Sequence, residues 1–400
     1  MTMIKLAGPI VGIGLLLASS AAIAETKVGA DVAVNAGYAS NPYGAVGGSG
    51  GTGSATLSGS FLPSVVMTSP TGTTTLGGEV THTEYTNRYS ATTDYGVSGS
   101  TSQQLSRLTA LTASAGFRSF VHNSLHPIYD PIIGIPTDPS APIIIDPSGA
   151  TSFAERVETI YGSVGLSTSL SSRDSVSATG RFSDVRYPNG ALASNRSYSS
   201  YGGGLSYQRL ISRDTSIGLA MNIGRADYRD GSLGDGTQIS PSVIFATKLA
   251  PRVSLNLSAG ATFNETNVVG GKIKNTLFAG SASLCNQGDR SNLCASLSRS
   301  VSPTSFAGTS KVTAFGLSHS YRLDPRSEIS TSLSYSRASS VGGLGRTTDY
   351  GTASVGYSRQ VAERLSATLR LSYSDTFDSS FSRGSNFYGA VGLRYRLGNF

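Results

Sequence analysis

The sequence lacks several features that common protein classes require. It has no tryptophan, two cysteines and four histidines in 400 residues. Charged residues make up 14% of the chain, whereas soluble domains carry about 25%. After residue 24, no stretch reaches the roughly 18 apolar residues that a membrane-spanning helix needs. These absences argue against a typical soluble domain and against a helical membrane protein.

The residues that are present favour β-structure. The chain contains 48 glycines, and serine and threonine are abundant throughout. Its aromatic and β-branched residues are too numerous for a disordered chain. Transmembrane β-strands face lipid only at every second residue, which explains a mean hydropathy of -0.05. The net charge of +7 is modest and its basic residues lie singly at turns, so we expect no nucleic-acid partner.

The first 24 residues read as a secretory signal peptide. Lys5 supplies a positive charge, Leu6 to Ala18 form an apolar core, and Ala22-Ile23-Ala24 is an Ala-x-Ala cleavage site. An N-terminal membrane anchor is the alternative, but the apolar core is too short for one. The sequence predicts cleavage after residue 24, and residues 25–400 then enter the periplasm as one barrel domain.

An internal repeat organises much of the remaining chain. Short turns that end in arginine recur at intervals of 36 to 40 residues, by subtraction of their numbers, at Arg173, Arg213, Arg252, Arg290, Arg326 and Arg364. Each repeat holds two alternating segments, such as Ile217/Leu219/Met221/Ile223. The pattern predicts an all-β, transmembrane, antiparallel up-and-down barrel of 16 to 18 strands, with eighteen segments identified.

An even strand number puts both chain ends on the periplasmic side, with the short turns, and the long loops outside. Tyrosines near the ends of the predicted strands fit two membrane-interface belts. The loop-end belt contains Tyr38, Tyr85, Tyr187, Tyr228, Tyr335, Tyr350, Tyr373 and Tyr388, and the turn-end belt contains Tyr207, Tyr321, Tyr357 and Tyr395. A soluble β-sandwich, the competing fold, would scatter or bury these tyrosines.

The longest predicted loop covers residues 118–154. Its six prolines rule out a regular strand or helix across it. Long loops without structure of their own are usually functional or disordered. The apolar triplet Ile143-Ile144-Ile145 suggests that the loop packs into the barrel mouth or against a partner. The other interpretation is an extracellular surface flap without a role.

Few residues could carry chemistry. Cys285 and Cys294 flank a predicted hairpin turn in the oxidising periplasm, which predicts a disulfide. A metal or redox site is the alternative, although no histidine lies near. His82 with Glu79 and Glu84, and His122 and His126 with Asp130, are the only candidate catalytic groups, and neither set has a partner motif. The sequence therefore predicts no enzyme, metal or cofactor.

Four arginines fall on the strand parity that faces the barrel interior, namely Arg181, Arg370, Arg394 and Arg396. A wet lumen tolerates charge, and arginines within it favour anions. The alternative is that they pair with lumen carboxylates such as Asp31 or Glu79. His319 falls on the lipid parity, which places it near a membrane interface.

The last strand resembles the closing strand of bacterial outer-membrane barrels. Val391, Leu393, Tyr395 and Leu397 share one parity and a terminal Phe400 follows. The resemblance implies that Tyr395, Leu397 and Phe400 form the signal read by the barrel-assembly machinery. Phe400 lies on the opposite parity, which predicts a kink after Leu397.

The chain as a whole resembles the porin 2 type of β-barrel encoded with exopolysaccharide export systems in Proteobacteria. The matching residues are Tyr38-Ala39-Ser40-Asn41-Pro42-Tyr43, Arg196-Ser197-Tyr198, Leu205-Ser206-Tyr207, Leu297-Ser298-Arg299, Ser302-Pro303-Thr304 and Gly308. The resemblance implies an integral protein of the Gram-negative outer membrane. It also implies a porin-like channel or accessory protein that serves polysaccharide export or passive solute passage, with polysaccharide or export-system proteins as partners. A structural or adhesive barrel with a filled lumen, which binds a partner through loop 118–154, is the alternative.

Overall fold

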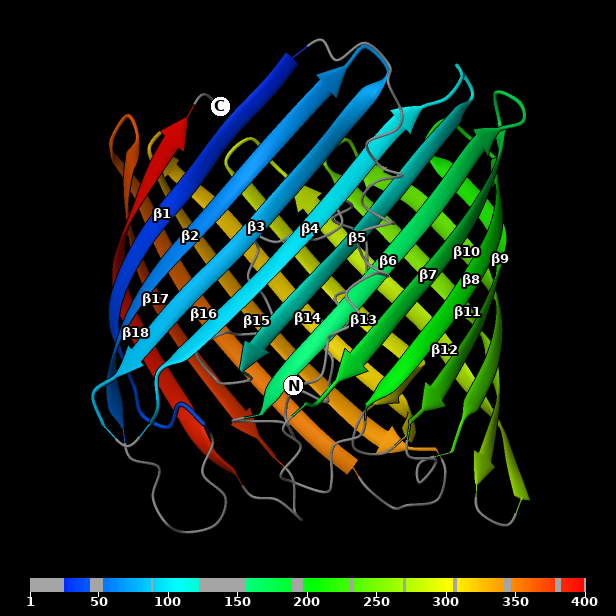
Figure 1. Ribbon diagram of the computed structural model, residues 1–400. Helices are drawn as coiled ribbons and strands as arrows, with labels where there is room; N and C mark the ends of the chain where they lie inside the picture. The colour runs from blue at the N-terminus through cyan, green and yellow to red at the C-terminus, as the bar shows by residue number, and fades with distance from the viewer. Residues whose placement is uncertain are drawn as a thin grey trace, which may run out of the picture.

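The fold is known from a computed structural model (Figure 1). It describes residues 25–43, 53–87, 89–121, 155–188, 197–229, 234–268, 271–304, 308–341, 347–377 and 383–398. The predicted signal peptide 1–24 and Phe400 lie outside these ranges, as do His122, His126 and Asp130. Within them, no helix is of a length and apolarity that could cross a membrane.

Eighteen strands account for most of the described chain, as the sequence predicts. They are β1 (Glu25–Ala39), β2 (Ser54–Ser69), β3 (Gly72–Tyr85), β4 (Thr92–Gln104), β5 (Thr109–Val121), β6 (Arg156–Ser169), β7 (Asp174–Arg186), β8 (Tyr198–Leu210), β9 (Thr215–Tyr228), β10 (Gly236–Ala250), β11 (Val253–Val268), β12 (Gly271–Gln287), β13 (Ser291–Thr304), β14 (Gly308–Asp324), β15 (Ser327–Ser340), β16 (Thr347–Ala362), β17 (Leu365–Thr376) and β18 (Arg383–Gly398). The predicted loop 118–154 begins too early, because Arg118 to Val121 belong to β5.

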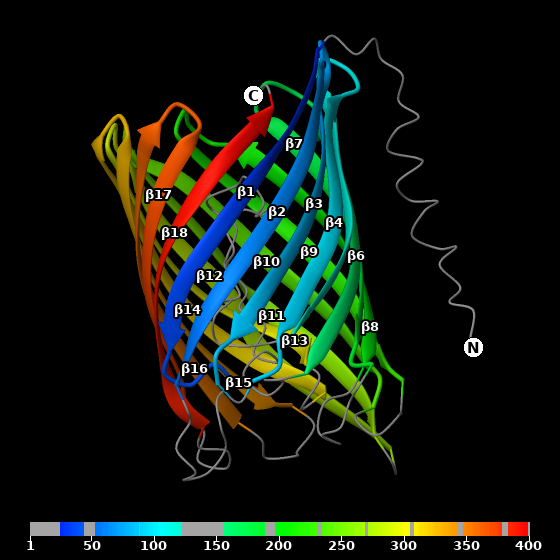
Figure 2. The same ribbon diagram turned by 60° about the vertical axis from the view of Figure 1, so that its left-hand side comes forward.

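The strands close into a single barrel. Each pairs antiparallel with its neighbours in the chain, and β18 returns to pair with β1 from Gly29–Gly398 to Ala39–Tyr388. Figure 2 shows β18 and β1 side by side. The predicted fold class, a transmembrane antiparallel up-and-down barrel, is confirmed.

The barrel has two distinct rims. The short-turn rim (top in Figure 1) carries residues 70–71, 105–108, 170–173, 211–214, 251–252, 288–290, 325–326 and 363–364. We call the rim at the opposite ends of the strands the loop rim. Serine stabilises several of these turns. Ser171 Oγ, for example, accepts hydrogen bonds from the backbone N–H of Arg173 at 3.1 Å and Asp174 at 3.0 Å. Ser106 and Ser212 accept equivalent bonds, which explains part of the recurring turn sequence.

Side chains alternate between two environments. Apart from Leu210 at the end of β8, the exposed large hydrophobic side chains of each strand share one parity, as with Ile217, Leu219, Met221 and Ile223 on β9. We call this surface the outer face and the opposite one the lumen face. Water-exposed side chains of this kind are unfavourable over so large an area, so the outer face requires lipid around it.

The prediction of a tyrosine belt at the loop rim is only partly confirmed. Tyr38, Tyr335 and Tyr373 are exposed on the outer face. Tyr85, Tyr187, Tyr228, Tyr350 and Tyr388 are instead buried on the lumen side. At the other rim, Tyr207, Tyr321 and Tyr395 are exposed on the outer face as expected. Five of the loop-rim tyrosines therefore pack the inside of the wall rather than mark a lipid interface.

The wall is irregular between β11 and β14. β12 and β13 pair only from Gln287–Asn292 to Gly280–Arg299, and beyond this point β12 pairs with β11 alone. The loop-rim end of β13 reaches β9, because the Tyr228 hydroxyl donates to the Thr304 carbonyl oxygen and accepts from the Thr304 N–H, both at 3.1 Å. The end of β13 thus lies behind the β11–β12 hairpin and against the β9 side of the barrel.

Candidate functional site: the lumen face

Hydroxyl groups dominate the lumen face. Pairs from neighbouring strands share short hydrogen bonds, among them Ser114–Ser163 at 2.8 Å, Ser177–Ser206 at 2.7 Å, Ser258–Ser281 at 2.8 Å, Ser332–Ser354 at 2.7 Å and Ser334–Thr352 at 2.6 Å. Each hydroxyl can donate one hydrogen bond and accept others. The lumen face therefore offers donors and acceptors to water or solute without carrying net charge at these positions.

Asp31 forms ion pairs with two of the predicted lumen arginines, Arg394 and Arg396, and offsets one of their two positive charges. It lies opposite Arg396 in the β1–β18 register, and its carboxylate accepts from Arg394 and, at 3.4 Å, from Arg396. The Asp31 side chain is only 14% exposed. Arg394 and Arg396 thus occupy the lumen face beside a carboxylate, as the pairing alternative describes.

A second ion pair depends on a glycine. The Nε of Arg118 lies 3.0 Å from Glu79 Oε1, although β4 separates their strands. Gly96, which pairs with both residues, makes this contact possible, because a Cβ there would lie 2.9 Å from Glu79 Oε1. Arg118 was not among the predicted lumen residues, although it falls both in the predicted strand 108–120 and at the start of the predicted loop 118–154. Its even parity on β5 was the signal that could have found it.

Arg181 and Arg370 form no ion pair within the described part of the chain. Arg181 on β7 lies over Gly202, where a Cβ would meet its Cγ at 3.1 Å. Arg370 on β17 has Gly356 and Ala390 as its cross-strand neighbours. Because neither guanidinium is neutralised there, these two arginines are the main source of positive potential on the middle of the lumen face.

Most other lumen charges gather at the short-turn rim. A hollow of about 270 Å³ between β14 and β1 is lined by five arginines and four carboxylates, namely Arg322, Arg326, Arg364, Arg394 and Arg396 with Asp31, Asp324, Glu328 and Glu363. The charges nearly balance. The hollow thus presents alternating ions close to the rim, in contrast to the hydroxyl-lined wall beyond it.

Two aromatic clusters pack the lumen side near the loop rim. One contains Val157, Val185, Tyr187, Tyr198, Ala226 and Tyr228, and the other Ala39, Tyr85, Tyr388 and Ala390 with Tyr43 and Tyr89. Tyr43 and Tyr89 stack with ring centroids 5.0 Å apart. Burial raises the pKa of the Tyr43 hydroxyl above its ordinary value. The rings of Tyr85, Tyr187, Tyr198, Tyr228 and Tyr388 are buried, so they stabilise the wall, whereas Tyr43 and Tyr89 are half-buried.

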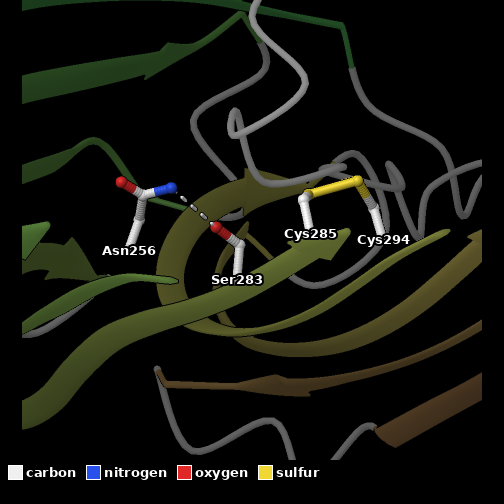
Figure 3. The surroundings of a disulfide bond; sticks show 4 residues. All are labelled: Asn256, Ser283, Cys285 and Cys294. Carbon is white, nitrogen blue, oxygen red and sulfur yellow. Dashed lines mark hydrogen bonds between the residues drawn. A yellow bond between two sulfur atoms is a disulfide. The ribbon is translucent and has the colours of Figure 1, made fainter. Parts of the chain in front are cut away.

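Cys285 and Cys294 form a disulfide between directly paired positions of β12 and β13, with their Cα atoms 4.1 Å apart. Both lie on the lumen face near the short-turn rim. Figure 3 shows the disulfide beside Asn256 and Ser283. Within the described ranges, no group of three or more histidine, cysteine or acidic side chains could hold a metal ion.

His82 and His319, the two histidines that the structure describes, do not assemble a catalytic group with each other or with Glu79. His82 lies on the outer face, where its ring contacts Thr93 Oγ1 at 2.8 Å and Glu84 Oε1 at 3.0 Å. Glu79, one of its predicted partners, lies on the lumen face, so β3 itself separates the two. His319 shares a hydrogen bond of 3.0 Å with Ser291 Oγ near the short-turn rim.

A closed barrel with an apolar outer face and a polar lumen face defines a transmembrane β-barrel. No family model and no curated protein matches the chain. Among solved structures it is similar to a BenF-like porin from Pseudomonas fluorescens Pf-5, at 10% identity and TM-score 0.48, over 94% of this chain and 99% of that one. Pseudomonas aeruginosa OccK5 (OpdH) has 12% identity and TM-score 0.47, over 94% and 99% of the two chains. These likenesses concern architecture alone, and we draw no function from them.

Proposed function

We propose that this protein is a passive channel of the Gram-negative outer membrane for small hydrophilic solutes. The observation that carries the proposal is the hydroxyl-rich lumen face inside a wall whose outer face is apolar. A polar interior of this kind is typical of barrels whose lumen holds water, as in porins. The barrel-assembly machinery and the lipid of the outer membrane are the partners that this location requires.

The charge of the lumen suggests which solutes pass. Arg181 and Arg370 lack ion pairs among the described residues, so the proposed channel favours neutral or weakly anionic solutes over cations. The sequence resemblance to porin 2 type barrels supports a further element of the proposal, that the solutes derive from exopolysaccharide or its export. Deletion of the gene and measurement of secreted polysaccharide tests that element separately.

Single-channel recording tests the proposal directly. Refolded protein in a planar lipid bilayer should give discrete conductance steps in potassium chloride, and the reversal potential in a salt gradient should show anion preference. Conductance no greater than that of the bare bilayer would contradict a channel. It would favour the structural or adhesive barrel, for which deletion of residues 122–154 should abolish partner binding while the barrel still folds.

A further inference from the structure

The lumen face of β9 to β13 contains a hollow of about 240 Å³ that is distinct from the charged hollow at the short-turn rim. We call it the amide hollow. Small side chains form its floor, because Ser242 on β10 pairs with Ala220 on one side and with Gly260 on the other. Longer side chains border it, namely Asn222, Ile244 and Asn256. Rows of small residues flanked by longer ones create the depression.

The lining of the amide hollow carries no ionisable group. The Asn222 side chain forms no hydrogen bond within the described ranges, and Asn256 Nδ2 makes only a long one, 3.4 Å, to Ser283 Oγ. Each amide therefore retains both donor and acceptor capacity. An ionic ligand would lose hydration here without meeting an opposite charge, which is costly. The chemistry thus selects a ligand that is neutral and rich in hydroxyl groups.

The volume of the amide hollow and its apolar border further limit the class of ligand that fits it. The volume is below the roughly 300 Å³ at which pockets for drug-sized ligands begin, so it suits a single ring. Ile244 supplies an apolar surface against which the C–H groups of such a ring can pack. Ser258 and Ser281 already share a hydrogen bond at 2.8 Å, which holds their hydroxyls in place.

The disulfide fixes one border of the amide hollow. Cys285 lies two residues after Ser283, and Cys294 lies two residues before Ser296, on the same face of their strands. Ser283 and Ser296 are themselves cross-strand partners. In Figure 3 the sulfur atoms lie beside the Asn256–Ser283 contact. The covalent link therefore holds β12 to β13 next to the hollow, only a few residues before the two strands separate.

We propose that the amide hollow is a binding subsite for one ring of a neutral saccharide. The proposal rests on the channel function above, and it adds the class of solute and the residues that recognise it. Asn256 hydrogen-bonds to the hydroxyls of this ring and Ile244 contacts its C–H groups. Asn222 pairs with Ser240 and Asn256 with Ala246, so Asn222 lies at the other end of the hollow and hydrogen-bonds to a neighbouring ring of a longer saccharide.

Calorimetry with a neutral trisaccharide tests the subsite. Maltotriose is titrated into the refolded full chain in lauryldimethylamine oxide, a detergent without a sugar headgroup. Asn256→Leu and Asn222→Leu should each weaken binding by about tenfold, because each removes hydrogen bonds to the ligand. Asn35→Leu is the matched control, since Asn35 Nδ2 makes the same 3.4 Å bond to a serine elsewhere on the lumen face. It should change binding by less than about twofold.

Three results would overturn the subsite. They are an absence of binding to folded wild-type protein, an equal loss for Asn35→Leu and Asn256→Leu, and binding of glucuronate without binding of maltotriose. Folding of every variant is checked by heat-dependent gel migration, and Asn256→Ser replaces Asn256→Leu if the latter does not fold. Bilayer conductance is recorded separately. Conductance without maltotriose binding contradicts only the subsite, whereas maltotriose binding without conductance contradicts only the channel.

Discussion

Two seams of the barrel wall close in opposite ways. β1 and β18, the first and last strands, pair over eleven residues, and an Asp31–Arg394–Arg396 cluster spans them on the lumen face. β12 and β13 are consecutive in the chain, yet they pair over only eight residues and then part. The seam between distant segments is complete, and the seam between adjacent segments is not.

The side chains on the outer parity explain this difference. On β18 they are Val391, Leu393, Tyr395 and Leu397, all suited to lipid. On β13 the outer parity changes after Leu297 to Arg299, Val301 and Pro303. Arginine is costly against lipid and proline has no N–H for a ladder. Val301 is only 6% exposed, so this part of β13 is covered. How completely two strands pair therefore depends on their lipid-facing side chains and not on whether they are consecutive in the chain.

The largest expected effect is at the complete seam. Asp31→Ala leaves two guanidiniums without their carboxylate, so we expect a loss of about 3 kcal/mol in the free energy of unfolding. The temperature at which the folded band disappears in a heat-modifiability gel should fall. Glu328→Ala is the control, because Glu328 forms no ion pair in the described part of the chain. Equal effects of the two substitutions would contradict a role for the cluster in closure.

At the incomplete seam between β12 and β13, Tyr228→Phe should be the conservative substitution that lowers the stability most. It leaves the buried N–H and carbonyl groups of Thr304 without their shared partner, at a cost of about 2 kcal/mol. Hydrogen exchange at the Thr304 amide should accelerate. Tyr201→Phe is the control, because Tyr201 is exposed on the outer face. It should change neither the free energy of unfolding nor the exchange rate of the Thr304 amide. An unaltered exchange rate in Tyr228→Phe would show that another contact holds the end of β13.

Loss of the disulfide should have a smaller effect. A link across about fifteen residues contributes roughly 3 kcal/mol, but β12 and β13 already pair around Cys285 and Cys294. For Cys285→Ser with Cys294→Ser we therefore expect a loss nearer 1 kcal/mol, measured by unfolding in urea with and without reductant. A loss as large as that of Asp31→Ala would mean that the disulfide, and not the ladder, holds this seam.

The smallest expected effect concerns selectivity. Arg181→Gln or Arg370→Gln should lower the anion-to-cation permeability ratio about twofold, because a wet lumen screens a single charge to less than about 1 kcal/mol. Arg394→Gln should change the ratio less, since Arg394 lies beside Asp31 in the charged hollow at the short-turn rim, where the surrounding ionic groups and water screen its charge. Reversal potentials in a salt gradient measure all three. A larger change for Arg394→Gln would indicate that pairing does not decide the lumen potential.

The strand pattern could be predicted because each strand repeats one simple rule, apolar against lipid and polar against water. The rule also locates Arg394 and Arg396 on the lumen face and offers Asp31 or Glu79 as their partner. It could not choose between these two carboxylates, since the register between β1 and β18 is a property of the closed barrel. Tyr228 and Tyr388 were misplaced because their position along the strand was considered without their parity. In the sequence, only Arg299 and Pro303 indicate that β12 separates from β13. Their effect depends on the hydrogen bonds that Tyr228 on β9 forms with Thr304, and the sequence does not show these bonds.

The closure of β18 on β1 brings the two ends of the described barrel to one rim, with Gly29 opposite Gly398. A short linker across that rim and a cut within residues 211–214 would give a circular permutant that retains all eighteen ladders. Its terminal strand would then be β8, and Tyr395 and Leu397 would lie in the interior of the chain. Such a permutant should refold in detergent yet fail to reach the membrane in cells. This result would separate the folding of the barrel from the recognition of the proposed C-terminal assembly signal.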